Sequence, residues 1–357
     1  MDGFLPLKGI DYLEWYVGNA RQAAHYFKSA FGFRSLAYAG PETGQKDRVS
    51  YVLSQGEIRL VLTTPLHAGS EIATHVHMYG DGVKCIALSV PDAKEAFILA
   101  TQNGAQPYLF PQRLESEEGD VVLAGIHAYA DNVHVFVERG HYRGCFLPGY
   151  QVWDSHFQPS YTGLYCIDHI SGHVSRRDIK RWREFYKNTM GFSSELVDLD
   201  DRFDKPKATV LYRDVGTSNL LRFPIHHAGA KAVSRAFHSV FMEWAKIPGV
   251  NHVALRTEDI IHTVSQLRKR GVDFWSVERL PFARIMDKIG RTNAKVAKLS
   301  ALSIMPTKDT WGYMLRAFTC PLEDRQRVCL EIVQRLDEAE SAALEELFMA
   351  MEENYEL

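Results

Sequence analysis

Two imidazoles and one carboxylate stand out as side chains that could bind a metal ion together. His169 occurs in IDHI, His252 in VNHVAL and Glu331 in CLEIVQR, and each segment has the apolar character of a short buried strand. Two histidines and one carboxylate form a set that holds Fe(II) on one face and leaves three coordination positions open. Zn(II) is the alternative ion, because ligand type alone does not exclude it. The three residues are far apart along the chain, so they form a site only if three strands of one sheet direct alternate side chains to the same point.

The elements that would position these residues occur in repeated units. Residues 9–33 and 166–192 both read as a strand, a polar turn and an amphipathic helix that ends in Gly-Phe. Residues 80–108 and 247–275 share another pattern: a short apolar strand, an aspartate suited to cap a helix, a helix and a glycine stop. Short alternating strands follow each helix, so the sequence predicts four β-α-β-β-β units.

Alignment of the two halves of the chain sets the candidate ligands apart from their counterparts. These counterparts are a phenol, a thiol and an isopropyl group, carried by Tyr12, Cys85 and Val135. A single histidine on a strand is more often a packed or surface residue than a ligand. Three metal-ligand residue types at matched positions reverse that expectation. The sequence therefore predicts a metal site in the second half of the chain only.

The repeated units also predict the fold class. We expect an α+β fold in which paired β-α-β-β-β units form two half-open barrels with their helices outside. Glycine, proline and aromatic residues interrupt the strand and helix patterns over residues 139–165, which is typical of a connector. The predicted domains are residues 1–150, without metal, and residues 151–357, which carry the catalytic site and a C-terminal lid helix.

Composition and charge narrow the choice of partners. The chain has 357 residues, of which 46% are hydrophobic and 24% charged, as in a globular protein of about two domains. The 41 Lys and Arg residues nearly balance 44 Asp and Glu residues, which argues against nucleic acid or an anionic membrane as a partner. The five cysteines lack CxxC spacing and no apolar run reaches membrane-spanning length, so we expect a reducing, cytoplasmic compartment.

Several longer motifs resemble the 4-hydroxyphenylpyruvate dioxygenase family of the vicinal-oxygen-chelate superfamily, over nearly the whole chain. They include WYVGNARQAA, YGDGVKCIAL, CFLPGY, GVNHVALRTEDI, LRKRGVDF and AFTCPLEDRQRVCLEIVQR. The resemblance implies the vicinal-oxygen-chelate fold, and it assigns the metal ligands of the family to His169, His252 and Glu331. It further implies Fe(II) as the cofactor, a metal centre that is itself the catalytic element, and O₂ and a small aryl 2-oxo acid as substrates. The nearest reaction is conversion of 4-hydroxyphenylpyruvate to homogentisate, and we expect a homo-oligomer, a dimer.

Other functions stay open on the same residues. A diverged paralogue could act as a hydroxymandelate-type synthase or on a different 2-oxo acid. A ring-cleaving catechol dioxygenase uses the same scaffold and ligands, but the motifs above favour the first family. A metal-free binding protein is disfavoured, because binding alone does not require this set of ligands.

The positions around the ligands depart from the family pattern. Six residues are predicted to contact the substrate: Asn251, His226, Phe237, Arg316, Phe318 and Leu344. Asn251 replaces a longer amide that precedes the second histidine ligand in the family. In FPIHHAG, His226 and His227 occupy the positions of an asparagine and a glutamate. Phe237 replaces a glutamine, whereas Phe318 keeps an aromatic side chain.

Arg316 is the departure with the largest chemical consequence, because the family pattern has a glutamine facing the substrate at this position. A guanidinium removed from water needs an anionic partner. One hypothesis is that the substrate carries an additional acidic or polar group. The alternative is that Arg316 pairs with an Asp or Glu of the pocket wall.

The C-terminal segment, residues 337–357, is acidic and carries an apolar stripe, which predicts a packed amphipathic helix. In the resembled family the last helix closes over the iron, so a role as a lid is also expected, with Leu344 near the pocket.

His75 and His77 resemble a pair of metal ligands at alternate positions of a strand. No third ligand is evident in the sequence, so metal binding there is disfavoured.

Overall fold

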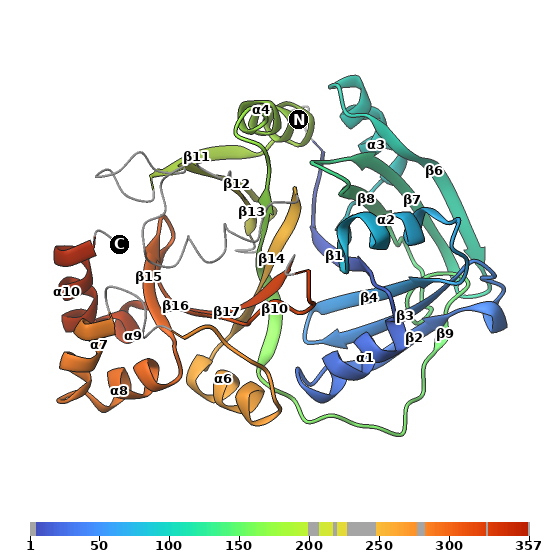
Figure 1. Cartoon of the computed structure of the whole chain (residues 1–357). Coiled ribbons are helices and arrows are strands. Elements are labelled where there is room, and N and C mark those ends of the chain that lie inside the picture. The colour runs from blue at the N-terminus through green and yellow to red at the C-terminus, as the bar shows by residue number, and fades with distance from the viewer. Residues whose placement is uncertain are drawn as a thin grey trace.

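The computed structural model gives the fold for most of the chain. The residues that it describes are 5–198, 207–216, 220–226, 248–276, 283–325 and 328–355. Within them the strands form two sheets, called here the first sheet and the second sheet in chain order, with helices around them (Figure 1). None of the described helices is long and apolar enough to cross a membrane.

The first sheet is formed by the N-terminal half of the chain. Its strands are β1 (Gly9–Tyr16), β2 (Arg34–Ala39), β3 (Arg48–Gln55), β4 (Ile58–Pro65), β5 (Gly82–Ser89), β6 (Pro107–Ser116), β7 (Gly119–His127), β8 (Val133–Glu138) and β9 (Gln151–Val152). They lie in the order β6-β7-β8-β5-β1-β4-β3-β2-β9. The helices are α1 (Ala20–Ser29), α2 (Glu71–Tyr79) and α3 (Ala93–Gln102), with a 3-10 turn, η1 (Pro41–Thr43).

The second sheet is formed by the C-terminal half. Its strands are β10 (Leu164–His173), β11 (Ser193–Asp198), β12 (Lys207–Asp214), β13 (Leu220–His226), β14 (Gly249–Thr257), β15 (Met305–Asp309), β16 (Gly312–Phe318) and β17 (Cys329–Arg335). Their order is β11-β12-β13-β10-β14-β17-β16-β15. The helices are α4 (Ile179–Met190), α6 (Ile260–Lys269), α7 (Ala283–Gly290), α8 (Ala294–Ala301), α9 (Glu338–Ala342) and α10 (Glu345–Tyr355).

The two sheets share one pattern of strand pairing. In the first sheet β1 is antiparallel to β5 and parallel to β4, and β5 is parallel to β8. In the second sheet β10 is antiparallel to β14 and parallel to β13, and β14 is parallel to β17. The predicted α+β architecture of paired β-α-β-β-β units is therefore confirmed. The second half also contains α7 and α8 between α6 and β15, where the first half passes directly from α3 to β6.

Local signals explain where several helices begin. Asn19, Asp92 and Asp259 have extended backbone at the N-cap, and each side chain accepts a hydrogen bond from a backbone amide of the first turn. These bonds satisfy amides that have no partner inside the helix. The two aspartates are the caps that the repeated sequence pattern predicts.

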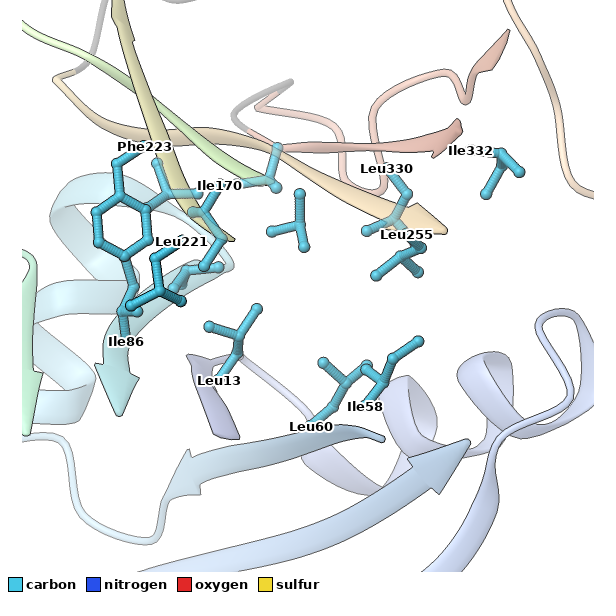
Figure 2. Packing of buried hydrophobic residues seen from close by; sticks show 14 of the residues in the cluster. Leu13, Ile58, Leu60, Ile86, Ile170, Leu221, Phe223, Leu255, Leu330 and Ile332 are labelled. Carbon is cyan, nitrogen blue, oxygen red and sulfur yellow. The ribbon is translucent and has the colours of Figure 1, made fainter. Parts of the chain in front are cut away.

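Part of the main apolar cluster lies between the two sheets. Figure 2 shows Leu13, Ile58, Leu60 and Ile86 of the first sheet across from Ile170, Leu221, Phe223, Leu255, Leu330 and Ile332 of the second. Side chains alternate along a strand, so neighbours of these core residues point to the opposite face. Leu330 and Ile332 flank Glu331 in this way. Packing between the sheets thus fixes the strands and leaves their other faces for chemistry.

A buried histidine crosses this interface and makes stability depend on pH. The imidazole of His134 lies 2.7 Å from the Tyr186 hydroxyl and 3.3 Å from the Ile86 carbonyl oxygen, and it stacks on Phe223. Burial lowers the pKa of His134 from 6.5 to about 4. Above pH 6.5 the group is neutral in both the folded and the unfolded states. Between these two pKa values only the unfolded chain takes up the proton, so stability falls as the pH falls.

We expect the free energy of unfolding to drop by about 3 kcal/mol between pH 7.5 and pH 4 through this residue alone, since one pKa unit equals about 1.4 kcal/mol. Urea titrations of the wild type and of a His134→Gln variant across this range measure the effect. The variant should lose less stability than the wild type on acidification. Parallel pH profiles for the two proteins would assign the acid sensitivity to other groups.

Two local predictions were wrong, and the structure adds a short strand to the connector. His75 and His77 lie on α2, because the Ser70 hydroxyl caps a helix there instead of a strand. The C-terminal segment is two helices, α9 and α10, and not one. The connector contains β9, which pairs with β2 and so belongs to the first sheet. The division into domains at residue 150 stays a prediction.

Candidate metal centre

Side chains from β10, β14 and β17 meet on one face of the second sheet. The Nε2 atoms of His169 and His252 lie 3.3 Å apart, and Oε2 of Glu331 lies 3.1 Å from the first and 3.2 Å from the second. All three residues are buried. Bonds of about 2.1 Å from one ion, at right to tetrahedral angles, would separate their donor atoms by about 3.0 to 3.4 Å. The triangle therefore has the size that a single divalent ion needs.

Strand register brings these residues together. Ala254 of β14 lies opposite His169 on β10 and opposite Glu331 on β17. The register shifts at Asp168 and at Asn251, and such bulges commonly re-aim side chains beside active sites. Because the side chain of Ala254 is small, the space between His169 and Glu331 is left for the imidazole and carboxylate groups.

The first sheet has the same register but an apolar set of side chains. Tyr12 lies opposite Ala87, which in turn lies opposite Val135, while Cys85 lies opposite Glu14. Tyr12, Cys85 and Val135 all belong to one apolar cluster on that face. The alignment of the two halves by sequence is thereby supported residue by residue, and at these three aligned positions the ligand types occur in the second sheet alone.

A carboxylate orients the first histidine. Oδ1 of Asp168 lies 2.9 Å from Nδ1 of His169, so the Nδ1–H group donates to it and Nε2 keeps its lone pair for the triangle. Arg335 donates two hydrogen bonds to Asp168, at 2.6 and 2.9 Å, and also contacts Asp309. Burial would raise the pKa of Asp168, but the bonds from His169 and Arg335 outweigh it and hold the pKa well below its usual range.

The first sheet keeps the carboxylate and the arginine of this network without the histidine. Arg139 donates to both oxygens of Asp11, at 2.8 and 2.6 Å. Asp11 and Asp168 each precede the first aligned residue of their half, Tyr12 and His169 respectively. The Asp–Arg pair is therefore common to both halves, and only its contact with an imidazole is particular to the second.

The Glu331 carboxylate has the chemistry of a cation ligand. It is 0% exposed, and neither oxygen accepts a directed hydrogen bond from a described residue. Nε of Arg316 lies 2.7 Å from Oε1, an ion-pair distance at which the N–H group is nevertheless poorly aligned. Burial raises the pKa of Glu331, but the charges of Arg316 and His169 outweigh it and hold the pKa well below its ordinary value. A buried anion left with unused lone pairs fits a bound metal ion.

The two imidazoles differ in their electrostatics. Burial lowers the pKa of His252 to about 4, so this ring is neutral near pH 7. A neutral imidazole carries one proton, and in the tautomer with that proton on Nδ1 the Nε2 atom has a free lone pair. Burial also disfavours the charged form of His169, but Glu331 and Asp168 more than compensate and raise its pKa. Binding of a metal ion at Nε2 of either ring requires that this nitrogen carry no proton.

The structure places some predicted substrate contacts beside the triangle. The rings of Phe318 and His226 lie 5.6 and 6.3 Å from the ring of His252, and the guanidinium of Arg316 lies 4.8 Å from the ring of Phe318. Asn251 precedes His252 at the bulge, and its buried Oδ1 has no hydrogen-bond partner among the described residues.

Two predicted contacts receive no such support. Leu344 is 1% exposed and packs in the main apolar cluster with Leu347 and Phe348, as a helix-packing residue does. Phe237, like His227, lies outside the described residues. For Arg316, the structure shows an ion pair with an acid, as one of the two alternatives held, but this acid is the proposed ligand Glu331.

Sequence reasoning missed Asp168, Arg335 and Ser171. The hydroxyl of Ser171 is fully buried and has no hydrogen-bond partner in the part of the chain that the structure describes; Ser171 lies on β10, opposite His252 of β14. The Asp–Arg pair could have been found, because Asp11 and Arg139 recur at the aligned positions. Ser171 has no such signal, since its counterpart in the first half is Glu14.

Comparisons with known proteins agree with this geometry. The Glyoxalase/Bleomycin resistance protein/Dioxygenase superfamily model matches residues 166–315. A solved 4-hydroxymandelate synthase mutant from Streptomyces coelicolor superimposes with a TM-score of 0.77 at 26% identity, over 98% of this chain and 99% of that one. A Mn(II)-bound glyoxalase from Novosphingobium aromaticivorans, at 12% identity and a TM-score of 0.54 over 93% of this chain and 84% of that one, shares the fold.

Similar sequences extend over nearly the whole chain. The 4-hydroxyphenylpyruvate dioxygenase of Aspergillus fumigatus is 34% identical over 92% of this chain and 87% of the relative. The enzymes of that name from Yarrowia lipolytica and Dictyostelium discoideum are both 32% identical over 92% of this chain. The two alignments cover 86% and 92% of those enzymes, respectively. With identity of this level along matched lengths, the vicinal-oxygen-chelate fold and a buried His-His-Glu cluster, the chain belongs to the 4-hydroxyphenylpyruvate dioxygenase family.

Proposed function

We propose that this protein is a non-haem Fe(II) dioxygenase that oxidatively decarboxylates an aryl 2-oxo acid and hydroxylates the remainder. His169, His252 and Glu331 are the proposed ligands, and residues 151–357 the proposed catalytic half. The observation that carries the proposal is the triangle of donor atoms, with edges of 3.1 to 3.3 Å, in a buried setting. Its facial arrangement of two histidines and one carboxylate is the set used by Fe(II) oxygenases. A cytoplasmic location and a homodimer stay predictions.

The metal would supply chelation of the 2-oxo acid through its carboxylate and keto oxygens and activation of O₂ beside it. The protein holds the ligands and shapes the space around them. Asp168 fixes the tautomer of His169, and the apolar core behind β10, β14 and β17 excludes water from the sheet. The unpartnered polar atoms Ser171 Oγ and Asn251 Oδ1 are available to a ligand or an ordered water. Phe318 provides an aromatic surface against His252.

Two products are compatible with this reaction. Conversion of 4-hydroxyphenylpyruvate to homogentisate is supported by the names of the similar sequences from Yarrowia lipolytica and Aspergillus fumigatus. Oxygenation at the benzylic carbon, which would give a 4-hydroxymandelate, is supported by the likeness to 4-hydroxymandelate synthase along 98% of the chain. The second reading stays open as the alternative.

Oxygen uptake by iron-reconstituted protein tests the proposal. Given a series of aryl and alkyl 2-oxo acids, the protein should consume O₂ and release CO₂ in equal amounts with at least one of them. Homogentisate and 4-hydroxymandelate are isomers of equal mass, so the product from 4-hydroxyphenylpyruvate must be compared with authentic standards by chromatography. Absence of iron-dependent oxygen uptake with every acid, together with failure to bind Fe(II) anaerobically, would contradict the proposed function.

A further inference from the structure

We infer that the substrate of this site is a 2-oxo acid that carries a second negative charge, and that Arg316 selects it. The inference rests on the proposed function and specifies its substrate class: it favours a different 2-oxo acid over 4-hydroxyphenylpyruvate, which carries a single negative charge at neutral pH. It begins from one contact: Nε of Arg316 lies 2.7 Å from Oε1 of Glu331, while Oε2 of the same carboxylate faces the two imidazoles. Arg316 thus lies beside the proposed metal position without occupying it.

Strand geometry holds the arginine on the face of the site. Arg316 and Phe318 are two residues apart on β16, so their side chains point to the same face of the second sheet. The guanidinium carbon lies 4.8 Å from the Phe318 ring, which packs edge-on against His252. A guanidinium stacked on an aromatic ring is restrained in orientation.

Among the described residues, Glu331 is the one anionic partner of this guanidinium. The closest contact uses Nε, and Arg316 forms no ion pair with any other described residue. The side chain is 23% exposed while its Nε is buried, so the exposed part lies elsewhere on the side chain. Terminal guanidinium nitrogens form the two-pronged donor that matches a carboxylate or phosphate.

The charges around the proposed metal position indicate how many negative groups the substrate must bring. Glu331 and Arg316 neutralise one another, so a bound divalent ion would leave the centre with two positive charges. The carboxylate common to all 2-oxo acids cancels one of them. Asp168 and Asp309 are already matched by Arg335 and Arg222 and contribute no net charge. Counted over the described residues, one positive charge then remains in a buried site, where an uncompensated charge is costly. A second acidic group on the substrate would neutralise it.

Matched ligand pairs test this inference without turnover. The protein is saturated with Ni(II) under nitrogen, and dissociation constants are measured by calorimetry. One pair is 2-oxoglutarate and 2-oxopentanoate, and the other is 4-carboxyphenylpyruvate and 4-methylphenylpyruvate. Within each pair a carboxylate replaces a methyl group of similar size, and the two pairs place the second charge at different distances from the keto acid.

The wild type is expected to bind the dianionic member of at least one pair about tenfold or more tightly than its partner, as one charge-assisted contact allows. Arg316→Gln should abolish this preference and leave the affinity for the monoanion within about threefold, whereas Arg316→Lys, which keeps the charge, should retain part of it. Ni(II) affinity is measured first for each variant, because Arg316 contacts Glu331. All titrations are then made at saturating metal.

Two outcomes would overturn the inference. Equal affinity of the wild type for both members of both pairs would show that no second charge is selected. Equal weakening of both members by Arg316→Gln would show that the arginine holds the carboxylate that every 2-oxo acid has. In both cases 2-oxo acids still bind the Ni(II)-loaded protein, so the proposed function survives. If Ni(II) does not bind, or no 2-oxo acid binds the loaded protein, the proposed function fails and the inference fails with it.

Discussion

His252→Ala is expected to weaken Fe(II) binding by more than about 100-fold, since changes that only disturb the orientation of a metal ligand already cost about 10- to 100-fold. Iron-dependent oxygen uptake should be lost with it. The reason is that His252 supplies one of three donor atoms, and its low pKa, about 4, keeps the ring neutral and able to bind a metal near pH 7. Calorimetric titration with Fe(II) under nitrogen measures the affinity, and an oxygen electrode measures the uptake.

The first sheet offers a matched control for this variant. Cys85 occupies the aligned position on β5, is 2% exposed and belongs to an apolar cluster. Cys85→Ala truncates a buried strand residue in the same register, and should leave the Fe(II) affinity unchanged. Imidazole added to His252→Ala should restore part of the metal binding by entering the vacated space. Wild-type Fe(II) affinity in His252→Ala would remove this histidine from the metal site.

Local patterns allowed most of the fold to be predicted. The helices α3 and α6 begin at Asp92 and Asp259, and both caps depend on a few neighbouring residues that the sequence displays directly. The pairing of β1 with β5 and of β10 with β14 is not local, but it followed from the internal repeat. What repeats in sequence must pack in the same way in both halves, so each half served as a template for the other.

The predictions that failed depend on features that the sequence pattern does not display. An apolar stripe does not show where a helix ends: the capping box between Asp337 and Glu340 begins α9, and the helix ends after five residues at Ala342. His75 on α2 pairs with Asp131, whose carboxylate lies 2.5 Å from the imidazole Nδ1 although the two residues are far apart along the chain. Alternation of two histidines is compatible with a strand until that partner is known.

The composition of the site was predictable, whereas its electrostatics were not. A change of residue type between aligned positions identified the three proposed ligands. The partner of Arg316 could not be chosen from the sequence, because it depends on the register of β16 against β17 and on the side-chain conformation. Phe318 lies opposite Glu331 in that register, and this places Arg316 diagonally across from the carboxylate, within ion-pair distance.

A role of Asp168 in positioning His169 can be separated from a role in stabilising the fold, because the chain contains the same Asp–Arg pair twice. Asp168 is 4% exposed and Asp11 is 5% exposed, and each accepts two hydrogen bonds from one arginine. Only Asp168 also accepts a hydrogen bond from an imidazole. If the pair merely stabilises the bulged strand, the two aspartates should behave alike. If Asp168 positions His169, loss of its charge should affect the metal as well.

Asp168→Asn is therefore expected to lower Fe(II) affinity by about 10- to 100-fold, the usual cost of losing the group that orients a ligating histidine. Asp11→Asn is the control, and should leave Fe(II) affinity within about twofold, while both variants lose stability, by up to about 3 to 5 kcal/mol for a broken buried ion pair. Calorimetry gives the affinities, urea unfolding gives the stabilities, and the visible spectrum of the Co(II) form reports a change in ligand geometry in Asp168→Asn alone. Should both variants lose similar stability and keep wild-type metal affinity and Co(II) spectra, Asp168 serves the fold only, and its bond to His169 has no part in metal binding.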